Sequence, residues 1–117
     1  MVFVGGGLGA VCRFLVTTAL SGKLGNFPIG TMTANLIGSL LMGLVVGILA
    51  SRAQVGAESV RLFVAVGFLG GFTTFSSFSA ETFALIQGGQ IFAAAANIIV
   101  SVTAGLAACA IGMKIAG

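Results

Sequence analysis

Four long apolar runs constrain the fold of this chain more than any other feature. They cover residues 3–21, 31–51, 60–87 and 90–113, and short polar stretches or a glycine pair separate them. A helix that crosses a bilayer needs about 20 apolar residues, so four crossings would use roughly 80 residues of the chain. The pattern predicts an all-α membrane protein: one domain, residues 1–117, with four transmembrane helices in the cell (plasma or inner) membrane.

Composition excludes several classes of function. Only 6% of the residues are charged and 58% are hydrophobic, whereas a soluble domain carries about 25% charged residues. The five basic residues are scattered singly, which leaves no patch for nucleic acid. Histidine is absent, and Cys12 and Cys109 lie inside apolar runs, so we expect small buried hydrophobes and neither a zinc site nor a disulfide. No nucleophile–base pair is visible, and we expect no enzyme activity.

The basic residues near the ends of the runs indicate the orientation only weakly. Lys23 marks the first connection, whereas Arg52, Arg61 and Lys114 mark the side of the termini. This three-to-one bias favours termini in the cytoplasm, but it is too small to determine one orientation. Insertion in both directions is therefore our hypothesis. Because four short helices cannot enclose a pathway and also shield it from lipid, we expect a homodimer, and near-neutral bias permits an antiparallel one.

The third run contains an irregular segment. At about 28 residues it is long for one simple crossing, and paired glycines and threonines interrupt it in FLGGFTTFSSFS, residues 68–79. We predict a third helix that is broken in mid-membrane near residues 70–75. Non-helical backbone at membrane depth survives only where protein or a water-filled path satisfies it, which favours an ion or substrate site over a mere kink.

Glycines are numerous, 19 in all, and several are spaced by four residues. Such spacing lets helices approach closely in a bilayer. The pairs for which we predict close helix contact are Gly5 with Gly9, Gly43 with Gly47, and Gly67 with Gly71.

Two polar stripes run along apolar helices. Thr31, Asn35 and Ser39 follow one another at intervals of four, as do Asn97 and Ser101, so each set lies on one helix face. Such groups often only hold helices together. Together with the polar break they favour a lined path whose donors are the Asn35 amide and hydroxyls, those of Ser76, Ser79, Ser39 and Ser101.

Charged and aromatic residues near the break remain open to more than one interpretation. Arg13 lies within the first run, where a charge is costly, so it is either functional or paired internally. Glu81 is a proton carrier, a partner for Arg13 or an interfacial residue, and we favour the structural interpretations. Phe75 and Phe78 follow the break directly. Ring edges turned inward would favour an anion and ring faces a cation.

The segments GGGLGAVCRF (residues 5–14), TMTANLIGSLLMG (31–43) and GFLGGFTTFSSFSAET (67–82) together resemble the Fluc/CrcB family of small fluoride channels. The resemblance covers all four runs in order. It implies an antiparallel, dual-topology homodimer with two fluoride pores and a structural sodium ion on the two-fold axis. The implied function is passive fluoride export that relieves fluoride toxicity.

The resemblance also implies roles for individual residues. Asn35 resembles the pore asparagine, and the ring edges of Phe75 and Phe78 would contact fluoride. Thr74 and Ser76 match hydroxyl positions near the pore, and Arg13 matches a vestibule arginine. The backbone carbonyls of Gly70 and Thr73 would coordinate sodium in both subunits. With the serines of the polar stripes, the predicted fluoride pore comprises Asn35, Phe75, Phe78, Thr74, Ser76, Ser101 and Ser39.

The fourth run departs most from the family pattern. Many relatives carry a tyrosine followed at intervals of four by two hydroxyl residues, whereas this chain has Asn97, Ser101 and Gly105. Two other functions are alternatives to a fluoride channel. One is a proton-coupled exporter of lipophilic cations resembling the small multidrug transporters, although the chain lacks their first-helix glutamate and has no Trp or Tyr. The other is a helper subunit of a larger membrane complex.

Overall fold

The computed structural model describes residues 1–23, 25, 27–51 and 57–116, and within them all regular structure is helical. The elements are α1 (Val2–Leu20), α2 (Ile29–Ser51), α3 (Ala57–Val60), the π-helix η1 (Arg61–Leu69), α4 (Gly70–Phe72), α5 (Phe75–Gln87) and α6 (Ile91–Ala116). Four segments are long and apolar enough to cross a membrane: Val2–Leu20, Ile29–Leu49, Arg61–Gln87 and Ile91–Ala116. The prediction of an all-α chain with four such helices is confirmed.

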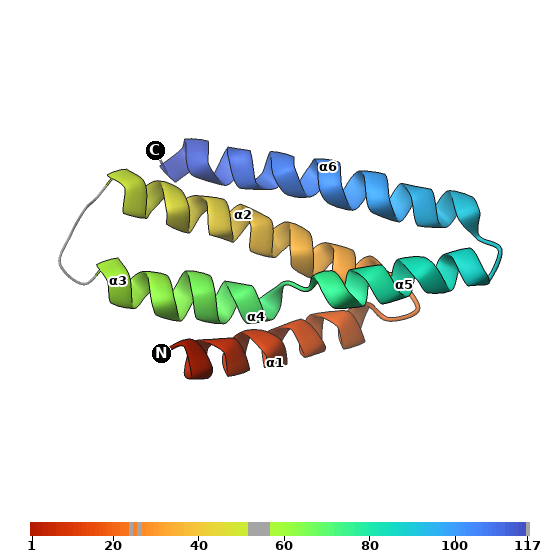
Figure 1. Cartoon of the computed structure of the whole chain (residues 1–117), viewed down its shortest axis with the longest axis horizontal. Coiled ribbons are helices and arrows are strands. Elements are labelled where there is room, and N and C mark those ends of the chain that lie inside the picture. Colours follow the sequence, from red (N-terminus) through yellow and green to blue (C-terminus); the bar gives the residue numbers. More distant parts are fainter. Residues whose placement is uncertain (24, 26, 52–56, 117) are drawn as a thin grey trace.

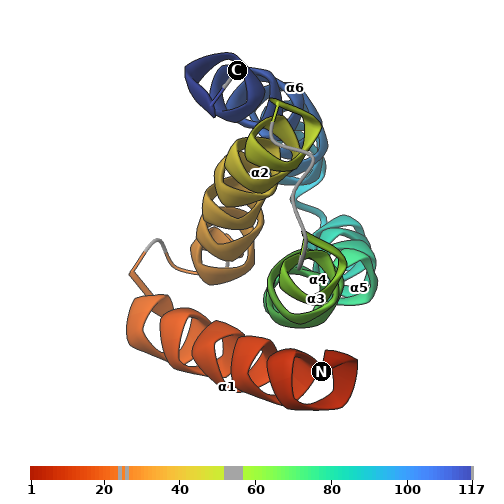
Figure 2. The same cartoon turned by 90° about the vertical axis from the view of Figure 1, so that its left-hand side faces the viewer.

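The four long segments form an elongated, open arrangement of about 52 × 28 × 19 Å. α6 lies along α2, and the third segment, from α3 to α5, lies between α2 and α1 (Figure 1). Viewed from the end, α1 and α6 occupy opposite sides of the molecule (Figure 2). Both termini lie at the same end, as four crossings require (Figure 1).

Glycines allow the backbones of neighbouring helices to approach closely at two contacts. Where α1 meets η1, a Cβ on Gly9 would collide with the backbone carbonyl of Phe68, and a Cβ on Gly67 would lie 3.1 Å from the Cα of Gly5. Where α2 meets α6, a Cβ on Gly43 would collide with the carbonyl of Cys109. Gly47 and Gly71 make similarly close approaches to neighbouring helices. The predicted role of the glycine pairs is confirmed, because only hydrogen fits between these backbones.

Two extended residues separate α4 from α5. Thr73 has φ −90° and ψ 158°, and Thr74 has φ −153° and ψ 126°. The Thr74 side chain caps α5 by accepting a hydrogen bond from the amide of Ser77 at 3.2 Å, as N-cap threonines commonly do. The helical path of the third segment is therefore interrupted between α4 and α5 (Figure 1). The side chains of Leu69 and Phe72, which precede the interruption, are buried.

Candidate functional site

A cavity of about 350 Å³ lies where α2, α6 and the extended residues meet. Three stretches far apart in the sequence form it, and amide, hydroxyl and aromatic groups occur among the lining residues. Within the described part of the chain its walls carry no charged side chain. The lining residues are Asn35, Gly38, Ser39, Met42, Thr73, Thr74, Phe75, Phe78, Ser101, Val102 and Cys109.

The side chain of Asn35 hydrogen-bonds both backbone groups of the extended residue Thr74. Its Oδ1 accepts from the amide of Thr74 at 2.8 Å, and its Nδ2 donates to the carbonyl of Thr74 at 3.1 Å. These two bonds determine the amide orientation, because a backbone N–H only donates and a carbonyl only accepts. Nδ2 carries two hydrogens. Asn35 therefore satisfies a non-helical residue and keeps one N–H for another acceptor.

Between α4 and α5, two backbone N–H groups donate to side chains and not to their regular helical carbonyls. A continuous helix would donate the Thr74 amide to Gly70 and the Ser77 amide to Thr73. Instead, the Thr74 amide binds Asn35 and the Ser77 amide binds the Thr74 hydroxyl. The carbonyls of Gly70 and Thr73 thus lose their regular helical donors. The amide and hydroxyl of Thr73 itself both donate to Leu69, at 3.0 Å each.

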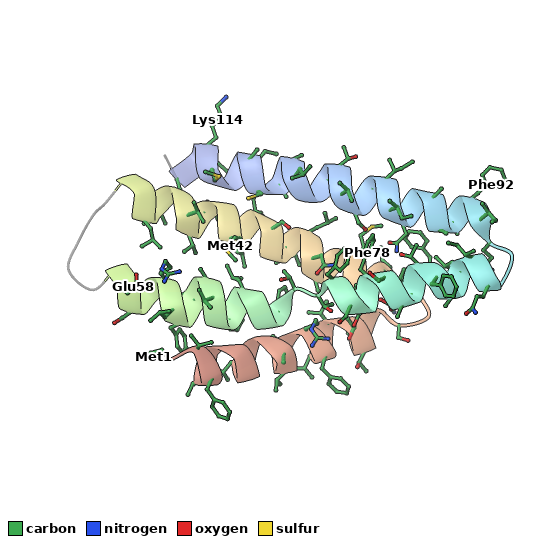
Figure 3. All side chains as sticks on the ribbon, in the orientation of Figure 1. Met1, Met42, Glu58, Phe78, Phe92 and Lys114 are labelled. Carbon is green, nitrogen blue, oxygen red and sulfur yellow. The ribbon has the colours of Figure 1, made fainter. Side chains whose placement is uncertain are left out.

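Phe75 and Phe78 form a ring pair at the start of α5. Their centroids are 5.9 Å apart and the rings are tilted by 44°. Phe78 is half-buried, whereas Phe75 is 79% exposed in the single chain. In Figure 3 the side chains of Met42 and Phe78 lie between α2 and the third segment. Both rings line the cavity, and their predicted contact with fluoride stays a prediction.

The serines predicted for the pore are placed differently. Ser39 and Ser101 line the cavity from α2 and α6. Ser76 is exposed and lies outside the lining, with its hydroxyl 3.3 Å from that of Thr74. Within the described residues the Ser39 hydroxyl has no hydrogen-bond partner. That of Ser101 donates to Oδ1 of Asn97 at 3.3 Å.

Asn97 belongs to a buried chain of hydrogen bonds behind the cavity. It is 1% exposed and donates from Nδ2 to the hydroxyl of Thr82 at 2.8 Å. Thr82 in turn donates to the carbonyl of Phe78 at 2.7 Å. Sequence reasoning did not single out Thr82, because an isolated threonine one turn after Phe78 carries no pattern of its own.

Arg13 and Glu81 do not pair with each other among the described residues. Nε of Arg13 donates to the carbonyl of Gly71 at 3.2 Å, and Arg13 lies outside the cavity lining. The carboxylate oxygen Oε1 of Glu81 is buried without a hydrogen-bond partner. Cys109 at the cavity wall and Cys12 are each half-buried in the single chain, whereas we expected buried side chains. The helix surface on which each lies, and not the apolar run alone, determines exposure.

Four apolar helices of spanning length and an open cavity with uncharged walls define a small multi-pass membrane protein. The family model described as CrcB-like protein, Camphor Resistance (CrcB), matches residues 1–113. The chain therefore belongs to the CrcB family, as its motifs indicate, and it is a multi-pass protein of the plasma membrane.

Curated relatives carry one common name. A protein of Sphingopyxis alaskensis named fluoride-specific ion channel FluC is 50% identical over 113 residues, which cover 96% of this chain and 89% of the relative. Proteins with the same name from Novosphingobium aromaticivorans and Coxiella burnetii are 49% and 42% identical. Those matches cover 97% and 98% of this chain and 91% and 94% of the relatives. These relatives are named as channels and not as enzymes.

Proposed function

We propose that this protein is a passive, fluoride-selective channel that exports fluoride across the plasma membrane and so relieves fluoride toxicity. The observation that carries the proposal is the cavity that joins Asn35, Ser39, Phe75 and Phe78 from separate helices. The names of the relatives support the choice of ion. Neutral walls support passive conduction, because a fixed cation would hold a small anion too tightly for it to leave.

The mechanism follows from the donors that face the cavity. Fluoride is small and strongly hydrated, so a path must replace its water with several close hydrogen-bond donors. The second N–H of Asn35 is available for this, because the hydrogen bonds of that side chain both go to the backbone of Thr74. The hydroxyl of Ser39 is available because it has no partner among the described residues. Positive ring edges of Phe75 and Phe78 add weak attraction. The membrane potential drives export, at about 2.3 kcal/mol per charge per 100 mV.

A second copy of the chain completes this site in our proposal. Phe75 is largely exposed, and the hydroxyl groups of Ser76 and Ser79 are also at the surface of the single chain. If the break lies in mid-membrane, lipid cannot satisfy these groups, and protein must cover them. The small charge bias permits an antiparallel homodimer with two pores, one on each side of the two-fold axis. Arg52, part of that bias, lies outside the described residues.

A sodium ion fits the break in the same proposal. The carbonyls of Gly70 and Thr73 lack their regular helical donors, and hard carbonyl oxygens suit a hard monovalent cation. Two copies meeting at their breaks would present four such carbonyls. When bound, the ion would supply positive charge that stabilises these oxygens and holds the two breaks together. Arg13 donates to another nearby carbonyl, that of Gly71, and from there draws anions toward the vestibule.

Fluoride efflux from liposomes tests the proposal. Purified protein is reconstituted, potassium ionophore clamps the charge, and a fluoride electrode follows release beside an identical chloride experiment. We expect rapid fluoride release with little chloride release. Release of both ions would contradict fluoride selectivity. Release of neither from verified dimeric protein would contradict a channel and favour a missing partner or proton-coupled cation export.

A further inference from the structure

The hydroxyl of Ser101, at the cavity wall, already donates a hydrogen bond to the side chain of Asn97. Oδ1 of Asn97 only accepts, so Ser101 must donate its single proton to it, at 3.3 Å. Toward the cavity Ser101 then presents oxygen lone pairs, which repel an anion. Ser39, which lines the cavity from α2, has no such partner within the described residues.

Thr82 determines which end of the Asn97 amide faces Ser101. The hydroxyl of Thr82 gives its only proton to the carbonyl of Phe78, which cannot donate. Thr82 can therefore only accept from Asn97, so Nδ2 lies toward Thr82 and Oδ1 toward Ser101. The three bonds form a directed chain that runs from Ser101 through Asn97 and Thr82 to the carbonyl of Phe78. Asn97 and Thr82 do not line the cavity themselves.

We propose that Asn97, oriented by Thr82, is a positioning residue that competes with the permeating anion for the Ser101 proton. The proposal rests on the proposed fluoride conduction. An anion that takes this proton must leave Oδ1 of Asn97 without its donor, and that oxygen belongs to a side chain only 1% exposed. Leaving a buried acceptor unsatisfied is unfavourable. The competition weakens the hold of Ser101 on the ion and so favours release.

The length of the bond suits an exchange of partners. At 3.3 Å it exceeds the usual range for hydroxyl donors, about 2.5–3.0 Å. The proton is therefore held lightly enough to move to an arriving anion and to return when the anion leaves. A path needs binding that is favourable but escapable, and this arrangement provides it with neutral groups.

Two variants release the Ser101 proton by different routes. Asn97→Ala removes the competing acceptor. Thr82→Val keeps the shape of the side chain and removes the acceptor for Nδ2, so the amide is free to turn and present its N–H groups to Ser101. Thr82→Ser retains the hydroxyl and is the matched control. Thr82→Val also serves if Asn97→Ala does not fold.

The experiment measures fluoride efflux against internal fluoride concentration and separates the half-saturating concentration from the maximal rate. For Asn97→Ala and Thr82→Val we expect the half-saturating concentration to fall by about two- to tenfold, as for one neutral hydrogen bond, and the maximal rate to fall with it. Thr82→Ser should match the parent. With Ser101→Ala added, neither variant should change the half-saturating concentration further.

Two results would overturn the proposal. One is a lower maximal rate with an unchanged half-saturating concentration, which simple structural damage would produce. The other is a shift that persists with Ser101→Ala, since Ser101 would then not be the group that Asn97 controls. If the parent protein itself releases no fluoride, the proposed function fails and not this inference alone.

Discussion

Asn35 on α2 and Asn97 on α6 each precede a serine by four residues, yet they bind different kinds of partner. Asn35 hydrogen-bonds both backbone groups of Thr74, a residue outside any helix. Asn97 hydrogen-bonds only side chains, those of Thr82 and Ser101. The serine after Asn35 is left without a partner among the described residues, whereas the serine after Asn97 is engaged.

An asparagine followed by a serine four residues later therefore has a different structural role on α2 than on α6. The amide on α2 replaces the hydrogen bonds that a helix would have made, and so permits an irregular segment beside the cavity. The amide on α6 lies between two regular helices and only determines where protons point. Removing the first should therefore damage the fold and conduction together, and removing the second should change the binding and release of the ion without that damage to the fold.

Asn35→Asp should have the largest effect. The carboxylate still accepts from the Thr74 amide, but it cannot donate to the Thr74 carbonyl or to an anion. Losing one hydrogen bond to this half-buried carbonyl costs about 0.5–1.5 kcal/mol, and the added negative charge repels fluoride. We expect a lower melting temperature in detergent and a loss of efflux of more than tenfold, as roughly 1.4 kcal/mol or more of lost stabilisation implies. Normal efflux would contradict both roles given to Asn35.

Gly43→Ala should come next, because α2 and α6 both line the cavity and their spacing shapes it. The new Cβ would collide with the carbonyl of Cys109 and lie 3.0 Å from the amide of Met113. Such overpacking costs about 1–3 kcal/mol. Gly105→Ala is the matched control on the same interface, since its nearest neighbour would be the Ser39 hydroxyl at 3.7 Å, an ordinary contact.

Melting temperature and efflux measured on both variants decide the point. Gly43→Ala should lower both, and Gly105→Ala should leave the melting temperature unchanged. Equal melting temperatures for the two variants would mean that the close approach of α2 and α6 is not required.

The difference between these positions could be predicted only in part from sequence. The four spans and the glycine contacts follow from apolar run length and local spacing, and both predictions are confirmed. The partner of Asn35 is 39 residues away, and no local pattern identifies it. The exposure of Ser76 and the role of Thr82 likewise depend on how α5 is rotated after two extended residues, a geometry that spacing alone does not determine.

Ser39→Ala and Ser101→Ala compare the two serines directly. The Ser39 hydroxyl is available to an anion, so its loss should raise the half-saturating fluoride concentration by about two- to tenfold. The Ser101 proton must first leave Asn97, so Ser101→Ala should raise it less. Concentration-dependent efflux from liposomes measures both. A larger effect at Ser101 would reverse the comparison and show that its proton is the more available one.

Glu58→Gln should have the smallest effect, because it removes a charge at the exposed start of the third segment, far from Phe78 (Figure 3). The hydrogen bonds from Arg61, at 2.6 and 3.1 Å, lower the pKa of the Glu58 carboxyl below its ordinary value of 4.5. A lowered pKa stabilises the fold above that ordinary value, and the contribution is lost as the pH falls through the folded-state pKa. The pair is fully exposed and therefore screened by solvent and salt.

We expect Glu58→Gln and the parent to have the same melting temperature and the same fluoride efflux at pH 7, at both low and high salt. Any small difference should appear only at low salt and should vanish as the pH falls through the folded-state pKa of Glu58, which lies below 4.5. A decrease in efflux as large as that of Ser39→Ala would show that an exposed ion pair outweighs a neutral donor in the cavity. The contrast between the two asparagines would then not explain conduction, because charge at the membrane surface would control the ion more than the hydrogen bonds along its path.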